Sequence, residues 1–302
     1  MDLAGTVVPM ATPVASDGRR IDEDTLADFT RSLVEGGVHG LFPGSSIGEF
    51  PSLTAEQTLT VVRTVVEAAD GDAPVIAGCC DTNVGDVRDL VGAAADAGAD
   101  AAVVVTPYYL DTTQRGLVRF FERVADDSPL PLLLYNIPAL TGNELGVETV
   151  ATLADCDAVV GLKDTSGSLV YQHDVIAATP PSFAVLSGQT ASAAASLDLG
   201  ADGLIAGPAN VFPAELAELY EAHARGDDAT VTRLVREVVL PLVSGYQNLP
   251  TATAIKRLVT RDRLDLGDPL PPLAPLSADE RERLDARYAA VAETVETGPP
   301  QR

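Results

Sequence analysis

The chain has 302 residues, of which 46% are hydrophobic, and it carries a formal net charge of −24. This length fits one large domain or two ordinary ones, and the composition is that of a soluble globular protein. An acidic surface of this kind repels nucleic acids and anionic membranes, so we exclude both as partners. We interpret the acidic excess as an ordinary feature of a soluble surface. The more specific interpretation is a halophilic adaptation, in which salt screens the repulsion between carboxylates.

Sequence signals for targeting, metal binding and cofactor binding are missing, which indicates a cytoplasmic protein without a metal or cofactor. The amino terminus lacks the basic and then apolar pattern of a signal peptide, and no apolar run reaches the roughly 20 residues that span a bilayer. Cys79, Cys80 and Cys156 show neither disulfide nor metal-ligand spacing, so we expect buried thiols. Three scattered histidines suggest no metal site, and there is no phosphate-binding glycine loop or dinucleotide fingerprint.

Short apolar runs typical of buried strands alternate with helical segments along the chain. The runs are Thr6–Pro9, Gly40–Phe42, Pro74–Gly78, Ala101–Val105, Leu132–Tyr135, Ala158–Lys163, Phe183–Gly188 and Gly203–Gly207. Four helices are expected between the first five runs. The first extends from Ile21 to Gly37, and the second from a capping box at Thr54–Gln57 to Gly71. The third ends near Gly98, and the fourth continues through Phe121.

Eight buried strands that alternate with helices predict an α/β fold, a (β/α)8 TIM barrel. A doubly wound open sheet is the competing architecture, although it more often has a glycine-rich turn early in the chain. We place the barrel at residues 1–225 and a C-terminal helical extension at 226–302. Helices at 227–246, 251–262 and 277–294 are expected to pack on the side of the barrel, and the tail from Gly298 is expected to fray.

Lys163 ends the sixth apolar run and is one of only two lysines in the chain. Burial at that position disfavours the charged ammonium form, and a neutral amine attacks a ketone carbon to form a Schiff base. The alternative is a structural lysine paired with a carboxylate.

The carboxyl ends of barrel strands converge on one face, where active sites form. Besides Lys163, the residues at these ends are Ser45, Ser46, Tyr108, Tyr109, Tyr135, Gly188 and Ile205. Tyrosines at such positions often serve packing, and serines often cap helices. Together on one face, however, they favour a site that handles protons.

These residues resemble a known family, the class I pyruvate-dependent aldolases of the dihydrodipicolinate synthase and N-acetylneuraminate lyase superfamily. The resemblance covers nearly the whole chain, and its segments are Thr106–Tyr109, Tyr135–Pro138, Gly161–Thr165, Leu186–Gly188 and Ala209–Asn210. It implies that Lys163 forms the Schiff base and that Tyr135 shuttles protons and contacts the carboxylate of the keto acid. It also implies that the backbone of Ile205 meets that carboxylate and that Tyr109 reaches across a tight dimer into the neighbouring site.

The resemblance further implies a homotetramer built from tight dimers, with pyruvate and an aldehyde as small-molecule partners. One departure lies in the family's Gly-Thr-Thr-Gly-Glu turn, which appears here as Ser45-Ser46-Ile47-Gly48-Glu49. By spacing, Ser46 stands in for the relay hydroxyl, Ile47 replaces the second hydroxyl, and Ser45 is a candidate to supply the missing one. The alternative alignment sets Ser45-Ser46 opposite the two threonines, with Ile47 inserted.

A second departure is Leu140, where dihydrodipicolinate synthases typically have an arginine for the carboxylate of aspartate semialdehyde. Leucine cannot make that bidentate contact. A leucine at this position is similar to the N-acetylneuraminate lyases. However, the segment Gly188-Gln189-Thr190-Ala191 lacks the acidic pair with which those lyases hold the hydroxyls of the sugar. We therefore predict a Schiff-base aldolase or dehydratase for 2-keto-3-deoxy sugar acids or related hydroxy-keto acids. The alternatives are 4-hydroxy-tetrahydrodipicolinate synthase and a non-catalytic keto-acid sensor. The expected substrate contacts are Ser45, Ile47, Leu140, Thr165, Gly188 and Ile205.

Overall fold

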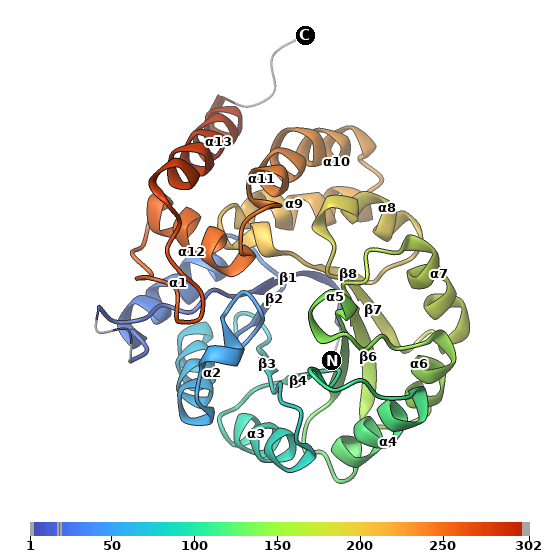
Figure 1. Cartoon of the computed structure of the whole chain (residues 1–302). Helices are drawn as coiled ribbons and strands as arrows, with labels where there is room; N and C mark the ends of the chain where they lie inside the picture. Colours follow the sequence, from blue (N-terminus) through green and yellow to red (C-terminus); the bar gives the residue numbers. More distant parts are fainter. Residues whose placement is uncertain (1–2, 17, 19, 298–302) are drawn as a thin grey trace.

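The structure, a computed structural model, describes residues 3–16, 18 and 20–297. In this part of the chain eight parallel strands form a barrel, and helices surround it in a ring (Figure 1). The strands are β1 (Gly5–Pro9), β2 (Gly40–Phe42), β3 (Ile76–Gly78), β4 (Ala101–Val105), β5 (Leu132–Asn136), β6 (Val159–Asp164), β7 (Ala184–Ser187) and β8 (Gly203–Ile205). The predicted tail from Gly298 lies outside the described residues.

Helices follow the strands in the predicted alternation. They are α1 (Glu23–Glu35), α2 (Ala55–Ala69), α3 (Val84–Asp96), α4 (Gln114–Ala125), α5 (Pro138–Thr141), α6 (Val147–Ala154), α7 (Leu169–Ala178), α8 (Ala193–Asp198), α9 (Pro213–Ala224), α10 (Asp228–Leu234), α11 (Leu240–Tyr246), α12 (Thr251–Asp262) and α13 (Ala278–Thr297). The shorter turns are η1 (Phe50–Ser52), η2 (Thr190–Ser192), η3 (Gly207–Asn210) and the π-helical η4 (Val235–Val239). The capping box that opens α2 at Thr54 is present as predicted.

Pairing of the first strand with the last excludes an open, doubly wound sheet. The strand order is β2-β1-β8-β7-β6-β5-β4-β3. The remaining seam, between β2 and β3, is bridged by a parallel pair, Leu41 with Val75, and by a hydrogen bond of 2.9 Å from Leu41 N to Pro74 O. The predicted (β/α)8 barrel is therefore confirmed.

The side chain of Asn210, which follows the last strand, forms hydrogen bonds with the chain at the end of the first strand. Its side-chain oxygen accepts a hydrogen bond of 2.9 Å from Ala11 N, and its amide nitrogen donates to Pro9 O at 3.0 Å. Both contacts are buried and join η3 to the end of β1 and the residues that follow it. A single asparagine thus holds the region after β8, next to the strand end that carries Ile205.

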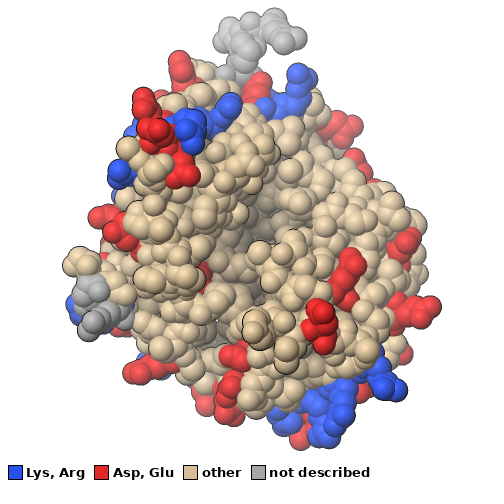
Figure 2. Space-filling model, viewed as in Figure 1, with Lys and Arg blue, Asp and Glu red and all other residues tan. Residues whose placement is uncertain are grey.

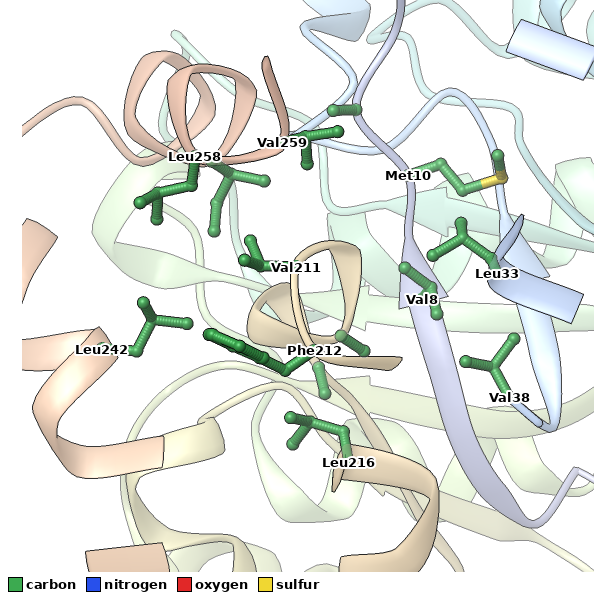
Figure 3. Close-up of a cluster of buried hydrophobic side chains, with 14 of the residues drawn as sticks. Val8, Met10, Leu33, Val38, Val211, Phe212, Leu216, Leu242, Leu258 and Val259 are labelled. Atoms are coloured by element: carbon green, nitrogen blue, oxygen red, sulfur yellow. The ribbon is translucent and has the colours of Figure 1, made fainter. Parts of the chain in front are cut away.

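The C-terminal helices share a hydrophobic core with the barrel's outer layer. Figure 3 shows Leu242 of α11 beside Phe212, Leu258 of α12 on the same side of the cluster, and Val8 of β1 on the other side. All four side chains are buried. Burying one such side chain contributes about 1.5–3 kcal/mol to the free energy of unfolding, so α11 and α12 are fixed against the barrel.

The helical run predicted for 227–246 is interrupted by the π-helical turn η4, within which Leu240 N donates to Val235 O. Pro241 follows directly in α11 and has no N–H to donate, so a continuous α-helical ladder is not available there. In the described ranges, 3–16, 18 and 20–297, no helix combines the length and the apolar character needed to cross a membrane.

The thiols differ in accessibility, contrary to the expectation that all three are buried. Cys79 and Cys80 are buried, but Cys156, between α6 and β6, is only partly so. Burial raises the pKa of Cys80 to about 12, which leaves almost no reactive thiolate near neutral pH.

Iodoacetamide at pH 8 should therefore label Cys156 of the native protein first, and Cys79 and Cys80 only after denaturation. Peptide mass mapping of a time course would check this order. Equal labelling rates at Cys80 and Cys156 in the native protein would contradict the buried environment described here.

Candidate active site

A cavity of about 640 Å³ lies at the carboxyl ends of the barrel strands. Figure 2 shows a hollow in the middle of this face of the molecule, bordered mainly by uncharged residues. The residues predicted for the site that line the cavity are Ser46, Ile47, Tyr135, Leu140, Lys163, Thr165, Gly188 and Ile205. Ser45 and Tyr109 do not line it.

A β-bulge in β6 turns Lys163 into the barrel. Along the β5–β6 pairing, Leu132 faces Val159 but Leu133 faces Gly161, so Val160 is an extra residue in β6. One extra residue reverses which side chains face inward, because strand side chains alternate with a period of two. Lys163 then pairs with Tyr135 and lies on the inner side.

Glycine is required beside the bulge. A Cβ atom at Gly161 would come within 2.5 Å of the Ala184 carbonyl oxygen on β7. Because this oxygen belongs to the backbone, the clash could be relieved only by shifting a strand. Gly161, two residues before the lysine, therefore lets β6 and β7 approach beside the bulge.

Lys163 is only 4% exposed, and aromatic rings surround its amine. Its Nζ lies 3.7 Å from the centroid of the Tyr135 ring and 4.9 Å from that of Phe42. Among the described residues no carboxylate forms an ion pair with Lys163, so the contact expected of a structural lysine is not found. The amine is held in a largely apolar environment and opens to the cavity.

The turn after β2 places one serine in the cavity and uses the other for its own structure. Ser46 Oγ lies 3.3 Å from the Tyr135 hydroxyl. Ser45 Oγ accepts from Gly48 N at 3.1 Å and donates to Met10 O at 3.4 Å, and the residue is 1% exposed. The hydroxyl of Ser45 therefore stabilises the turn and is not presented to the cavity, whereas the hydroxyl of Ser46 faces Tyr135.

Thr165 lines the cavity but buries its own hydroxyl against Gly188. Its buried Oγ1 has no partner among the described residues. A Cβ atom at Gly188 would come within 2.2 Å of this oxygen, so glycine is what leaves room for the threonine. A buried hydroxyl without a partner is costly to a folded protein.

Next to Lys163, a buried carboxylate ties the ends of β5 and β6 together. Asp164 accepts from Asn136 Nδ2 at 2.9 Å and from Ser166 Oγ at 2.9 Å. Burial raises the pKa of Asp164, and these hydrogen bonds oppose the increase. The adjacent strand ends, which carry Tyr135 and Lys163, are thereby held in register.

Part of the cavity wall comes from outside the barrel and was not predicted. Of the described residues that line the cavity, only Lys163 and Glu49 are charged. The unpredicted wall residues from the C-terminal region are Val243, Tyr246, Pro250, Thr251, Ala252, Pro272 and Leu273. Helical periodicity indicates which face of α11 or α12 packs inward, but no sequence signal shows that these helices end at a cavity.

Tyr109 points away from the cavity of its own chain. It is 94% exposed, and its φ of 76° is unusual for a residue other than glycine. Leu110 beside it is 72% exposed. The structure therefore presents two large side chains to the surroundings on a strained loop after β4.

Comparison with known proteins identifies the family. The model of the dihydrodipicolinate synthetase family matches residues 2–291. An uncharacterized DapA-like lyase of Halobacterium salinarum is 36% identical over 96% of this chain and 94% of its own length. A 4-hydroxy-tetrahydrodipicolinate synthase of Rhodospirillum centenum is 39% identical over 79% of this chain and 81% of its own.

A solved structure gives the same answer. YagE, a prophage protein of the dihydrodipicolinic acid synthase family from E. coli K12, was determined in complex with pyruvate. It superposes with a TM-score of 0.91 at 32% identity and covers 96% of this chain and 99% of its own. The chain therefore belongs to the dihydrodipicolinate synthetase family and is an enzyme, a pyruvate-dependent class I lyase.

Proposed function

We propose that the protein cleaves or forms the bond between C3 and C4 of a 4-hydroxy-2-keto acid through a Schiff base on Lys163. The observation that carries this proposal is the buried amine of Lys163, 3.7 Å from the Tyr135 ring and without an ion-pair partner among the described residues. The Tyr135 hydroxyl and Ser46 Oγ, 3.3 Å apart, form the proton relay.

In the cleavage direction, Lys163 Nζ attacks C2 of the keto acid, and water leaves to give an iminium. The relay removes the proton of the C4 hydroxyl, the C3–C4 bond breaks, and its electron pair moves into the iminium to give an enamine and a free aldehyde. A proton returned to C3 and one water molecule then release pyruvate and the amine. General acid–base help of this kind contributes about 10²–10⁴-fold.

The carboxylate of the keto acid fits against the turn after β2. In the described part of the chain the backbone N–H groups of Ser46 and Ile47 have no protein acceptor. Two neighbouring N–H groups at a turn form a suitable carboxylate site, which makes the hydroxyl that Ile47 lacks unnecessary there. Ile205 and Gly188 border the same cavity.

We propose a 2-keto-3-deoxy sugar acid, or a related hydroxy-keto acid, as the substrate. Thr165, Gln189 and Thr190 line the cavity, and their polar character matches the hydroxyls of such a compound. The alternative, 4-hydroxy-tetrahydrodipicolinate synthase, is favoured by the names of several relatives. The synthase reaction requires a cation that holds the carboxylate of aspartate semialdehyde, and Leu140 supplies none.

A panel of keto-deoxy sugar acids, assayed for released pyruvate, tests this proposal against aspartate semialdehyde plus pyruvate. We expect turnover of at least one sugar acid and poor condensation with the semialdehyde. Leu140→Arg should improve the condensation, because the guanidinium makes charge-assisted contacts with the carboxylate. Efficient condensation by the unmodified protein would restore the synthase as the proposed function.

We also propose that the working unit is a homotetramer built from tight dimers, in which Tyr109 completes the relay of the neighbouring subunit. Its 94% exposure and that of Leu110 nearby support this assembly. Tyr109→Phe keeps the ring and should lower the turnover rate roughly 10²-fold without dissociating the subunits, because only the hydroxyl is lost. Light scattering and activity on the same sample would check both parts, and full activity of the variant would remove Tyr109 from the relay.

A further inference from the structure

Two charged side chains that the proposed chemistry does not use are buried at the edge of the cavity. Glu49 and Lys256 form an ion pair, with 2.8 Å between Lys256 Nζ and Glu49 Oε1, and neither side chain is more than 2% exposed. The pair joins the turn after β2 to helix α12. Burial lowers the pKa of Lys256, and the negative charge of Glu49 opposes that shift. A buried ion pair adds little to stability, because the loss of hydration offsets the attraction.

The pair is built into a larger set of hydrogen bonds. Lys256 Nζ also donates to Asp268 O at 3.0 Å, and Glu49 Oε2 accepts from Leu270 N at 2.5 Å. Both oxygens of the Glu49 carboxylate therefore have a donor. The segment that supplies these contacts continues to Pro272 and Leu273, which line the cavity.

Glu49 lies close in the chain to the relay serine. Its backbone has φ 61° and ψ 33°, a left-handed conformation that costs energy for a residue with a Cβ atom. In this conformation Glu49 N donates to Ser46 O at 3.2 Å and closes the turn whose Ser46 hydroxyl contacts Tyr135. Such strain persists only where surrounding contacts hold it.

We infer that the buried Glu49–Lys256 pair holds the turn 45–49 in its strained conformation and so keeps the Ser46 hydroxyl within reach of Tyr135. Lys256 is then a positioning residue: it touches no reacting atom and acts through Glu49 and Ser46. The inference rests on the proposed function, since it concerns the relay of that reaction. A displacement of about 1 Å at a reacting group lowers rates by up to roughly 100-fold, so the effect is measurable.

A double-mutant cycle between Lys256→Met and Ser46→Ala tests the inference. The readout is the exchange of pyruvate methyl protons for deuterium in D₂O, followed by NMR, which needs no aldehyde partner. In this exchange the iminium loses a C3 proton to the relay and the enamine takes up a deuteron. We expect each single variant to slow exchange by about 10- to 100-fold and the double variant to be little slower than Ser46→Ala alone, because both act through one hydroxyl.

Arg257→Met is the matched control. Arg257 is the next residue of α12 and forms an ion pair with Asp285 of α13, with 2.5 Å between Nη2 and Oδ2, away from the cavity. Its loss should leave the exchange rate unchanged. If Lys256→Met alone does not fold, the cycle is repeated with Glu49→Gln/Lys256→Met, which leaves no unpaired buried charge.

Three outcomes would overturn the inference. The first is a normal exchange rate in a folded Lys256→Met protein. The second is a double variant whose exchange rate falls by the product of the Lys256→Met and Ser46→Ala factors, as expected of two independent defects. The third is a Glu49→Gln/Lys256→Met protein that does not fold, because the pair would then support the whole fold. Failure of the unmodified protein to form a borohydride-trapped adduct at Lys163 would instead refute the proposed function, so the two failures are distinguishable.

Discussion

Replacing Lys163 by methionine should reduce pyruvate methyl exchange and pyruvate release to the uncatalysed background. Methionine retains most of the length of the side chain, and it fits between the Tyr135 and Phe42 rings that surround the amine. Without the amine no iminium forms, and the C3–C4 bond has no acceptor for its electrons. Because enzymes typically accelerate their reactions by at least about 10⁶-fold, this is the largest effect that we predict.

The fold should survive the substitution, since Lys163 makes no ion pair with the described residues. Thermal unfolding followed by circular dichroism would check this independently of activity. Lys163→Arg gives the same test with a side chain that stays protonated, which also cannot form an imine. A folded Lys163→Met protein that retains a substantial part of the rate would contradict the Schiff-base mechanism.

Tyr135→Phe should lower the exchange rate by about 10²–10⁴-fold, the usual range for losing a general acid–base group. Phenylalanine keeps the ring that packs against Lys163 Nζ and removes only the hydroxyl that contacts Ser46. Pyruvate should therefore still form a Schiff base, and the loss should appear in the steps that move protons. Measuring the trapped fraction at equilibrium together with the exchange rate separates binding from proton transfer.

Tyr108→Phe is the matched control. Tyr108 lines the same cavity, and its ring packs edge-to-face against Phe50, with 6.3 Å between centroids. No hydrogen bond of its hydroxyl to the relay is found among the described residues, and burial raises the pKa of this phenol. We expect a small effect of this change on exchange. Equal losses in the Tyr108 and Tyr135 variants would show that general disturbance of the cavity, not the relay, limits the rate.

The barrel could be predicted from the sequence because its signals are local. Each strand is a short apolar run, and the capping box at Thr54 marks the start of a helix. The predicted third strand began at Pro74, whereas β3 begins at Ile76, and the predicted eighth ended at Gly207, where η3 begins. Such shifts at element ends are expected, because the ends depend on contacts with neighbouring strands.

The site could be predicted only in part, since some of its features depend on pairings that are distant in sequence. The bulge at Val160 arises from the register with β5, so the strand pattern alone does not show that Lys163 faces inward. Ser45 and Ser46 are adjacent and chemically identical, and their contacts distinguish them: Ser45 bonds within the turn, and Ser46 contacts Tyr135. The partner of Glu49 lies 207 residues away, beyond any local pattern.

Reductive trapping tests the central claim most directly. The native protein is incubated with pyruvate and sodium borohydride, and its intact mass and peptides are measured. We predict the added mass of one reduced pyruvyl group per chain, located on Lys163, and no addition without pyruvate. The chain's only other lysine, Lys256, is buried in its ion pair with Glu49 and serves as an internal control. Labelling of Lys256 in place of Lys163, or no adduct at all, would contradict the Schiff-base account.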